Sequence, residues 1–67
     1  MPSTDAPPEV RAALDHPEQA PSLGLVVAQV WTAAWRAGLD LGLTRAEATE
    51  RANEDPEVLA ILVRIRG

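Results

Sequence analysis

Histidine and cysteine, the side chains that bind zinc most often, are sparse in this sequence of 67 residues, which has no cysteine. His16 is the only histidine, and it stands directly before Pro17 with no second ligand at helical spacing. A zinc site in a protein needs three or four such ligands held together. We therefore expect no metal site, and we interpret His16 as a surface residue at the end of a helix.

Nucleophilic catalysis finds as little support in the sequence. Neither serine, Ser3 or Ser22, has a base close to it along the chain, and tyrosine and lysine are absent. Glu54 and Asp55 could serve as an acid–base pair, but a helix end followed by a helix cap explains them more simply. No glycine-rich phosphate loop is present. We therefore expect neither catalysis nor a cofactor, and an enzyme would need a cleft where carboxylates and Arg36 converge.

The net charge of the chain argues against two classes of partner, nucleic acids and anionic membranes. The formal net charge is −4, which argues against a basic nucleic-acid-binding surface and against binding to an anionic membrane. All the basic residues are arginine, and with the abundant alanine this is typical of a GC-rich bacterial genome. The first residues lack the basic and apolar regions of a signal peptide, so we expect a cytoplasmic protein.

The elements that would position any site are helices, and the longest is expected in the stretch SLGLVVAQVWTAAWRAGLDLGL, which runs from Ser22 to Leu43. Ser22 is predicted to cap its N-terminus, and Gly42 to adopt the left-handed conformation after its C-terminus. At 100° per residue, the polar side chains of Gln29, Arg36 and Asp40 fall in one narrow stripe. A membrane span would need about 20 mostly apolar residues, and this stripe interrupts the run.

The rest of this helix is apolar and divides into two sectors. One sector, which we call the tryptophan sector, contains Val27, Trp31, Trp35 and Leu39. The second sector contains smaller side chains: Val26, Val30, Ala33, Ala34, Ala37 and Leu41. Small residues four apart allow another helix to approach closely. One sector is thus expected to face the chain's own helices and the other a second copy, unless the monomer covers both.

Start and stop signals predict three further helices. Proline and glutamate begin one over Pro8–His16, which Pro17 ends, and Pro17–Pro21 is then a stiff linker. The capping box Thr44-Arg45-Ala46-Glu47 begins a helix over Arg45–Glu54. Asp55-Pro56-Glu57 begins another over Pro56–Arg64. Residues 63–67 are compatible with either helix or strand, because Val63-Arg64-Ile65-Arg66 also alternates between apolar and basic residues.

Together these signals predict an all-α fold, a small bundle of about four short helices around one long apolar central helix. Residues 1–6 are expected to form a disordered tail and residues 7–67 a single helical domain, in which the second and fourth helices make the core and the first and third cover them. A chain of about 60 residues buries only about 60% of its unfolded surface, and oligomerisation is a common way to complete so small a core.

The function expected from this fold is protein–protein association without catalysis, as a homo-oligomer or as an accessory subunit of a larger protein. The predicted interface uses apolar residues of the second and fourth helices. These residues are Val27, Trp31, Ala34, Trp35, Gly38, Leu41, Leu59 and Leu62. An alternative is a small-ligand module in which the tryptophan sector stacks on the ligand.

A second alternative comes from the segment Leu39–Ile65. Gly42-Leu43-Thr44-Arg45-Ala46-Glu47-Ala48 resembles the opening of the first motif helix of helix-turn-helix proteins, and the Asp55-Pro56 junction resembles their turn. The resemblance implies a DNA-binding regulator. A recognition helix presents polar and basic side chains to the major groove, whereas Val58 to Val63 is aliphatic. DNA binding therefore requires the arginines at 45, 51, 64 and 66 to share one exposed face.

Overall fold

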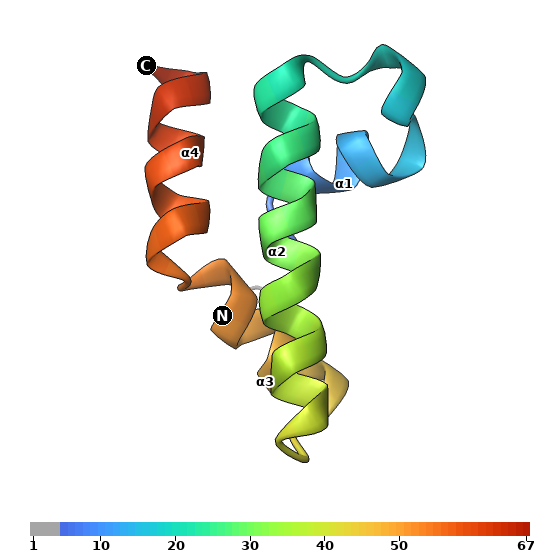
Figure 1. The fold of residues 1–67 in the computed structure, drawn as a ribbon, viewed down its shortest axis with the longest axis vertical. Coiled ribbons are helices and arrows are strands. Elements are labelled where there is room, and N and C mark those ends of the chain that lie inside the picture. The colour runs from blue at the N-terminus through green and yellow to red at the C-terminus, as the bar shows by residue number, and fades with distance from the viewer. Residues whose placement is uncertain (1–4) are drawn as a thin grey trace.

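A computed structural model of the chain describes residues 5–67 and places them in one all-α structure. The helices are α1 (Pro8–Asp15), α2 (Ser22–Asp40), α3 (Arg45–Asn53) and α4 (Pro56–Arg66), with a short 3₁₀ turn, η1 (Pro17–Gln19), after α1. Figure 1 shows α2 and α4 standing beside each other, with α1 and α3 behind them. The predicted all-α class is confirmed.

The predicted start signals of α3 and α4 are present as hydrogen bonds. The Thr44 hydroxyl accepts from the backbone N–H of Glu47 at 3.2 Å, and the Glu47 carboxylate accepts from the backbone N–H of Thr44 at 3.0 Å. At α4, one Asp55 oxygen accepts from the backbone N–H groups of Glu57 and Val58, at 2.9 and 3.3 Å. These bonds satisfy first-turn donors that have no partner within their own helices.

The two predicted ends of α2 had different outcomes. Gly42 has a φ of +91°, a conformation open to glycine, so the predicted left-handed C-terminal residue is confirmed. The predicted Ser22 cap is wrong. Pro21 occupies the cap position, its carbonyl accepts from the backbone N–H of Leu25 at 3.1 Å, and no side chain caps the helix. Because the extended Pro21 already supplies the first carbonyl, Ser22 is the first helical residue.

The structure also refines the linker and the end of the last helix. The linker Pro17–Pro21 contains η1, because Pro17 suits the first position of a helical turn. The helix predicted over Pro56–Arg64 continues to Arg66, so the last residues, which the sequence left open between helix and strand, are helical. The Arg66 guanidinium there donates to both oxygens of Glu9 in α1, one of them from Nη2 at 2.9 Å, which ties the end of α4 to the start of the domain.

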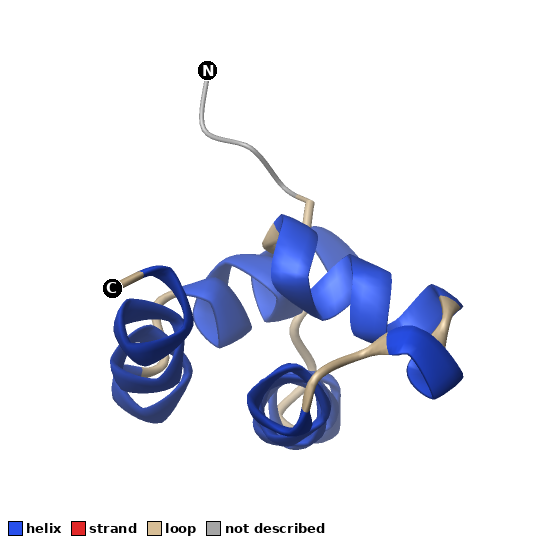
Figure 2. Ribbon diagram, turned by 90° about the horizontal axis from the view of Figure 1, so that it is seen from above, coloured by secondary structure: helices blue, strands red, loops and turns tan. Residues whose placement is uncertain are grey.

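The core draws on every helix. α2 packs against α1, α3 and α4, and the main buried cluster contains Val10, Ala13, Val27, Ala28, Trp31, Ala52, Val58 and Leu62. The second and fourth helices were predicted to make the core and the first and third to cover them. In the structure the covering helices also belong to the core, because Val10 of α1 and Ala52 of α3 are fully buried. Figure 2 shows why: α1 and α3 lie on the same side of the α2–α4 pair and close over it.

The opposite side of α2 has no helix over it in the part of the chain that the structure describes, as Figures 1 and 2 both show. The predicted tail falls mostly outside the described residues, at 1–4. Asp5 and Ala6 are placed against the domain: the Asp5 carbonyl accepts from Asn53 at 2.9 Å, and Ala6 packs on the core. None of the helices described is long and apolar enough to cross a membrane.

Candidate interaction surface

Many of the large aliphatic side chains of this chain are exposed, and few are buried. Every leucine is among the described residues, and Leu62 alone of them is buried. The core is built mainly of valine and alanine, with Trp31. The exposed large aliphatic residues are Leu14, Leu23, Leu25, Val26, Leu41, Leu59 and Val63. Single exposed apolar residues are ordinary, whereas a continuous row of them indicates a binding surface.

One such row follows the uncovered side of α2. The outer face of α2, as we call it, consists of Leu23, Val26, Val30, Ala33, Ala37 and Leu41. Val26 is 44% exposed and Leu41 67%, while Val30 is half-buried at the edge of the core. Residues three and four apart lie along one side of a helix, so these side chains form a stripe along α2.

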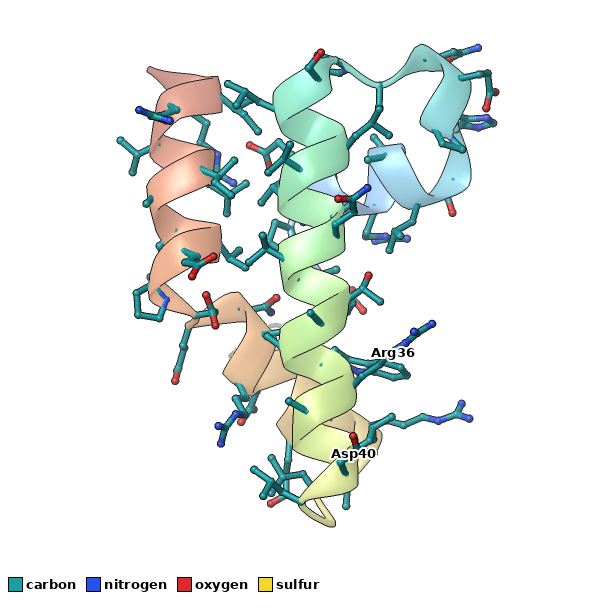
Figure 3. All side chains as sticks on the ribbon, in the orientation of Figure 1. Arg36 and Asp40 are labelled. Carbon is teal, nitrogen blue, oxygen red and sulfur yellow. The ribbon has the colours of Figure 1, made fainter. Side chains whose placement is uncertain are left out.

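A polar edge borders this stripe, as the sequence predicted. Gln29, Arg36 and Asp40 are all exposed, and Figure 3 shows Arg36 and Asp40 projecting from the same side of α2. Neither Arg36 nor Asp40 forms an ion pair or side-chain hydrogen bond within residues 5–67. The outer face of α2 thus carries one unpaired charge of each sign beside exposed aliphatic side chains.

The residues predicted to form an interface fall into buried, half-buried and exposed groups in the structure. Val27, Trp31 and Leu62 lie in the chain's own core. Gly38 is also buried, Ala34 and Trp35 are half-buried, and only Leu41 and Leu59 are exposed. The tryptophan sector therefore faces the chain's own helices. In the second sector, Val26, Ala33, Ala37 and Leu41 are exposed, while Val30 and Ala34 pack on the core. The spacing of three and four residues was the signal that could have placed Val26, Ala33 and Ala37 on the same face as Leu41.

Gly38 marks where α3 approaches α2 most closely. A Cβ atom at Gly38 would lie 3.2 Å from both Cα and Cβ of Ala48, and 3.3 Å from Cδ1 of Leu43. Ala48 is fully buried by this contact. The small residues at this end of α2 therefore serve a contact inside the monomer, and α3 has no large apolar side chain to cover anything beyond it.

The two tryptophans are held by partners in the chain. The Trp31 indole Nε1 donates to Asn53 Oδ1 at 2.8 Å, and the Trp31 and Trp35 rings stack with centroids 6.2 Å apart at an interplanar angle of 12°. Trp31 is only 8% exposed. Its polar atom is satisfied and its ring faces are covered, as expected of a core residue.

A surface hollow of about 310 Å³ lies where α1, η1, the start of α2 and the end of α4 meet. Glu9 and His16 line it together with apolar side chains. The hydrogen bond from Arg66 lowers the pKa of Glu9, so this carboxylate is already engaged. His16 Nδ1 lies 3.6 Å from Glu18 Oε1, and both side chains are well exposed. The hollow thus brings no free acid and base together.

The arginines singled out by the sequence lie at two ends of the molecule. Arg45 and Arg51 belong to α3 and Arg64 and Arg66 to the far end of α4, as Figure 1 shows. Arg66 is paired with Glu9. Arg51 lines a shallow hollow that it shares with acidic residues, namely Glu47, Glu50, Glu54 and Asp55.

Residues 5–67 hold no cluster of three or more histidine, aspartate or glutamate side chains placed to bind a metal ion. Comparisons of the chain with protein families, curated proteins and solved structures gave no match. Its candidate site is therefore argued from its own residues, and the outer face of α2 is the strongest surface among them.

Proposed function

We propose that this chain is a non-catalytic helical protein that works by protein–protein association, and that its first partner is a second copy of itself. The observation that carries the proposal is the outer face of α2, a row of exposed aliphatic side chains on a side that no helix of the described chain covers. An accessory subunit that docks on a larger protein would use the same surface.

The energetics favour association over isolation. Each Å² of apolar surface removed from water contributes about 25 cal/mol, and this chain leaves all its leucines but Leu62 at least partly in water. A domain of about 60 residues is marginally stable alone. A second copy over α2 would bury apolar surface that the chain's own short helices do not reach.

The other two alternatives are less well supported. DNA binding needs basic side chains on one face, and here the arginines of α3 and of α4 stand at different ends. Stacking of a small ligand on the tryptophans needs a free ring face, and Trp31 is buried with its N–H bonded to Asn53.

Light scattering over a wide range of protein concentration tests the proposal. We expect the molar mass to rise from 7.2 kDa towards a fixed multiple of that value as concentration increases. A helical, folded chain that stays at 7.2 kDa at every concentration would overturn self-association. Circular dichroism on the same samples shows whether the chain is folded.

A further inference from the structure

We propose that α2 pairs with α2 of a second copy in antiparallel orientation, around a two-fold axis that passes beside Ala37. This inference rests on the proposed association and deepens it by naming the partner and the contact. Three features at the C-terminal end of the outer face of α2 lead to it: its small side chains, its one large side chain, Leu41, and the two unpaired charges beside it.

The small side chains set how closely two copies can approach. Ala33 and Ala37 are exposed, four residues apart on the uncovered side of α2. Alanine at both positions lets a second helix come near along this part of the stripe, as Gly38 does for α3 on the opposite side. Most oligomers of identical chains are closed by a two-fold axis, which presents the same patch to itself.

The charges fix the register. Arg36 lies one residue before Ala37 and Asp40 three residues after it. With the axis beside Ala37, the partner's Asp40 lies on the same side of the axis as Arg36. At 1.5 Å per residue, the two are offset by about 3 Å along the helix, which an arginine side chain spans. Each dimer then contains two Arg36–Asp40 pairs between chains.

The same register also places Leu41, the most exposed large side chain of the face. Leu41 lies four residues after Ala37, and Ala33 lies four residues before it. Leu41, 67% exposed in the single chain, is therefore level with the partner's Ala33, where there is room for it. One choice of axis thus pairs both charges and covers both Leu41 side chains.

Self-complementarity is the argument for a second copy over a different protein. A different protein would need an acid, a base and a small side chain at matching positions. In a second copy, Asp40, Arg36 and Ala33 supply all three. The contact is limited to one end of α2 in each chain, so we expect a modest dimer with a dissociation constant of roughly 10 µM to 1 mM.

Charge reversal tests the register. Arg36→Asp leaves two acids on each face and Asp40→Arg leaves two bases, so each homodimer gains like-charge contacts. We expect sedimentation velocity to show at least about a tenfold rise in the dissociation constant for either variant, since like charges placed against each other weaken association strongly. Arg64→Asp makes the same change of net charge on α4, and Glu50→Arg the same on α3, so both should dimerise like the natural chain.

Mixing the two variants separates contacts between chains from effects within one. An equimolar mixture of the Arg36→Asp chain and the Asp40→Arg chain should form heterodimers, because each then offers the charge that the other needs. Native mass spectrometry resolves the heterodimer by mass. Homodimers and heterodimers in statistical proportion, with both variants as tight as the natural chain, would overturn this register and leave the association itself standing. A natural chain that is monomeric throughout would overturn both.

Discussion

The two faces of α2 both carry aliphatic side chains but have different surroundings. On the inner face, Val27 is fully buried and Trp31 is 8% exposed, under α1, α3 and α4. On the outer face, Val26 is 44% exposed, although it directly precedes Val27 in the chain. The two neighbouring valines differ in exposure because the three other helices all pack against one side of α2.

A second contrast runs along the inner face. At its centre the contacts are made by large side chains such as Trp31. Near its C-terminal end Gly38 has no side chain, and a Cβ atom placed there would lie 3.2 Å from Cα and Cβ of Ala48 in α3. The apolar side chains that α3 offers to α2 are alanines, so this contact depends on the close approach of the two helices and not on large apolar side chains of α3. The outer face is barest there, at Leu41.

Removing a side chain from the inner face should have the largest effect. Trp31→Ala leaves a cavity in the core and leaves Asn53 without its donor. We expect the free energy of unfolding to fall by about 3–5 kcal/mol, enough to unfold much of the protein. Trp35→Ala, at a half-buried position, should cost clearly less. Urea titrations followed by circular dichroism measure both, and equal costs would contradict the distinction between the two rings.

Adding a side chain should separate the two faces. Gly38→Val pushes a branched side chain into Ala48 and should destabilise the fold by about 1–3 kcal/mol through overpacking. Ala37→Val, one residue away on the outer face, should cost only the difference in helix propensity, about 0.6 kcal/mol. Thermal unfolding at low protein concentration, where monomers dominate, compares them. A cost for Ala37→Val as large as that for Gly38→Val would show that the outer face is not free.

The helix caps provide a smaller contrast. Asp55→Ala removes two hydrogen bonds at the start of α4 and should cost about 1 kcal/mol. Ser22→Ala removes no cap, because Pro21 holds that position, and should change the unfolding midpoint by almost nothing. If Ser22→Ala were the more damaging of the two in urea titrations, the corrected start of α2 would be wrong.

The smallest expected effect is the dependence of stability on pH. The hydrogen bond from Arg66 lowers the pKa of Glu9, and the backbone N–H of Thr44 lowers that of Glu47, both from an ordinary value of 4.5. Since a lowered pKa in the folded state favours the charged form, this stability is complete above the ordinary value. It is lost as the pH falls through the lowered values.

The Glu9→Gln variant tests the part of this effect that comes from Glu9. It should be slightly less stable than the natural chain near pH 7 and equal to it once the pH is below the lowered pKa of Glu9, where the carboxylate is protonated in both the folded and the unfolded state. Urea midpoints across that range measure the difference. A constant difference at all pH values would show that the Arg66 contact does not depend on the charge of Glu9.

Local signals in the sequence were enough for much of the fold. The capping box at Thr44, the Asp55 cap and the left-handed Gly42 depend on neighbouring residues alone, and all three are present in the structure. Ser22 was misjudged because a serine after proline suits either the cap or the first helical position. The helical end of the chain was left open because its pairing partner, Glu9, is distant in sequence.

Only part of the candidate interaction surface could be predicted from the sequence. The periodicity of α2 separated a tryptophan sector from a sector of small residues, but it does not say which sector the other helices cover. That choice depends on where α1 and α3 pack, which long-range contacts decide. The predicted interface therefore mixed core residues such as Val27 with exposed ones such as Leu41.

The central claim is that the outer face of α2 meets the same face of a second copy, and a single cysteine tests it most directly. The chain has no cysteine of its own. A disulfide needs Cα atoms within about 7 Å, so Ala37→Cys, at the proposed axis, should cross-link rapidly to itself under mild oxidation. Ser22→Cys is equally exposed on the same helix but about 22 Å further along it, and should cross-link slowly. Equal rates for the two variants would contradict the account.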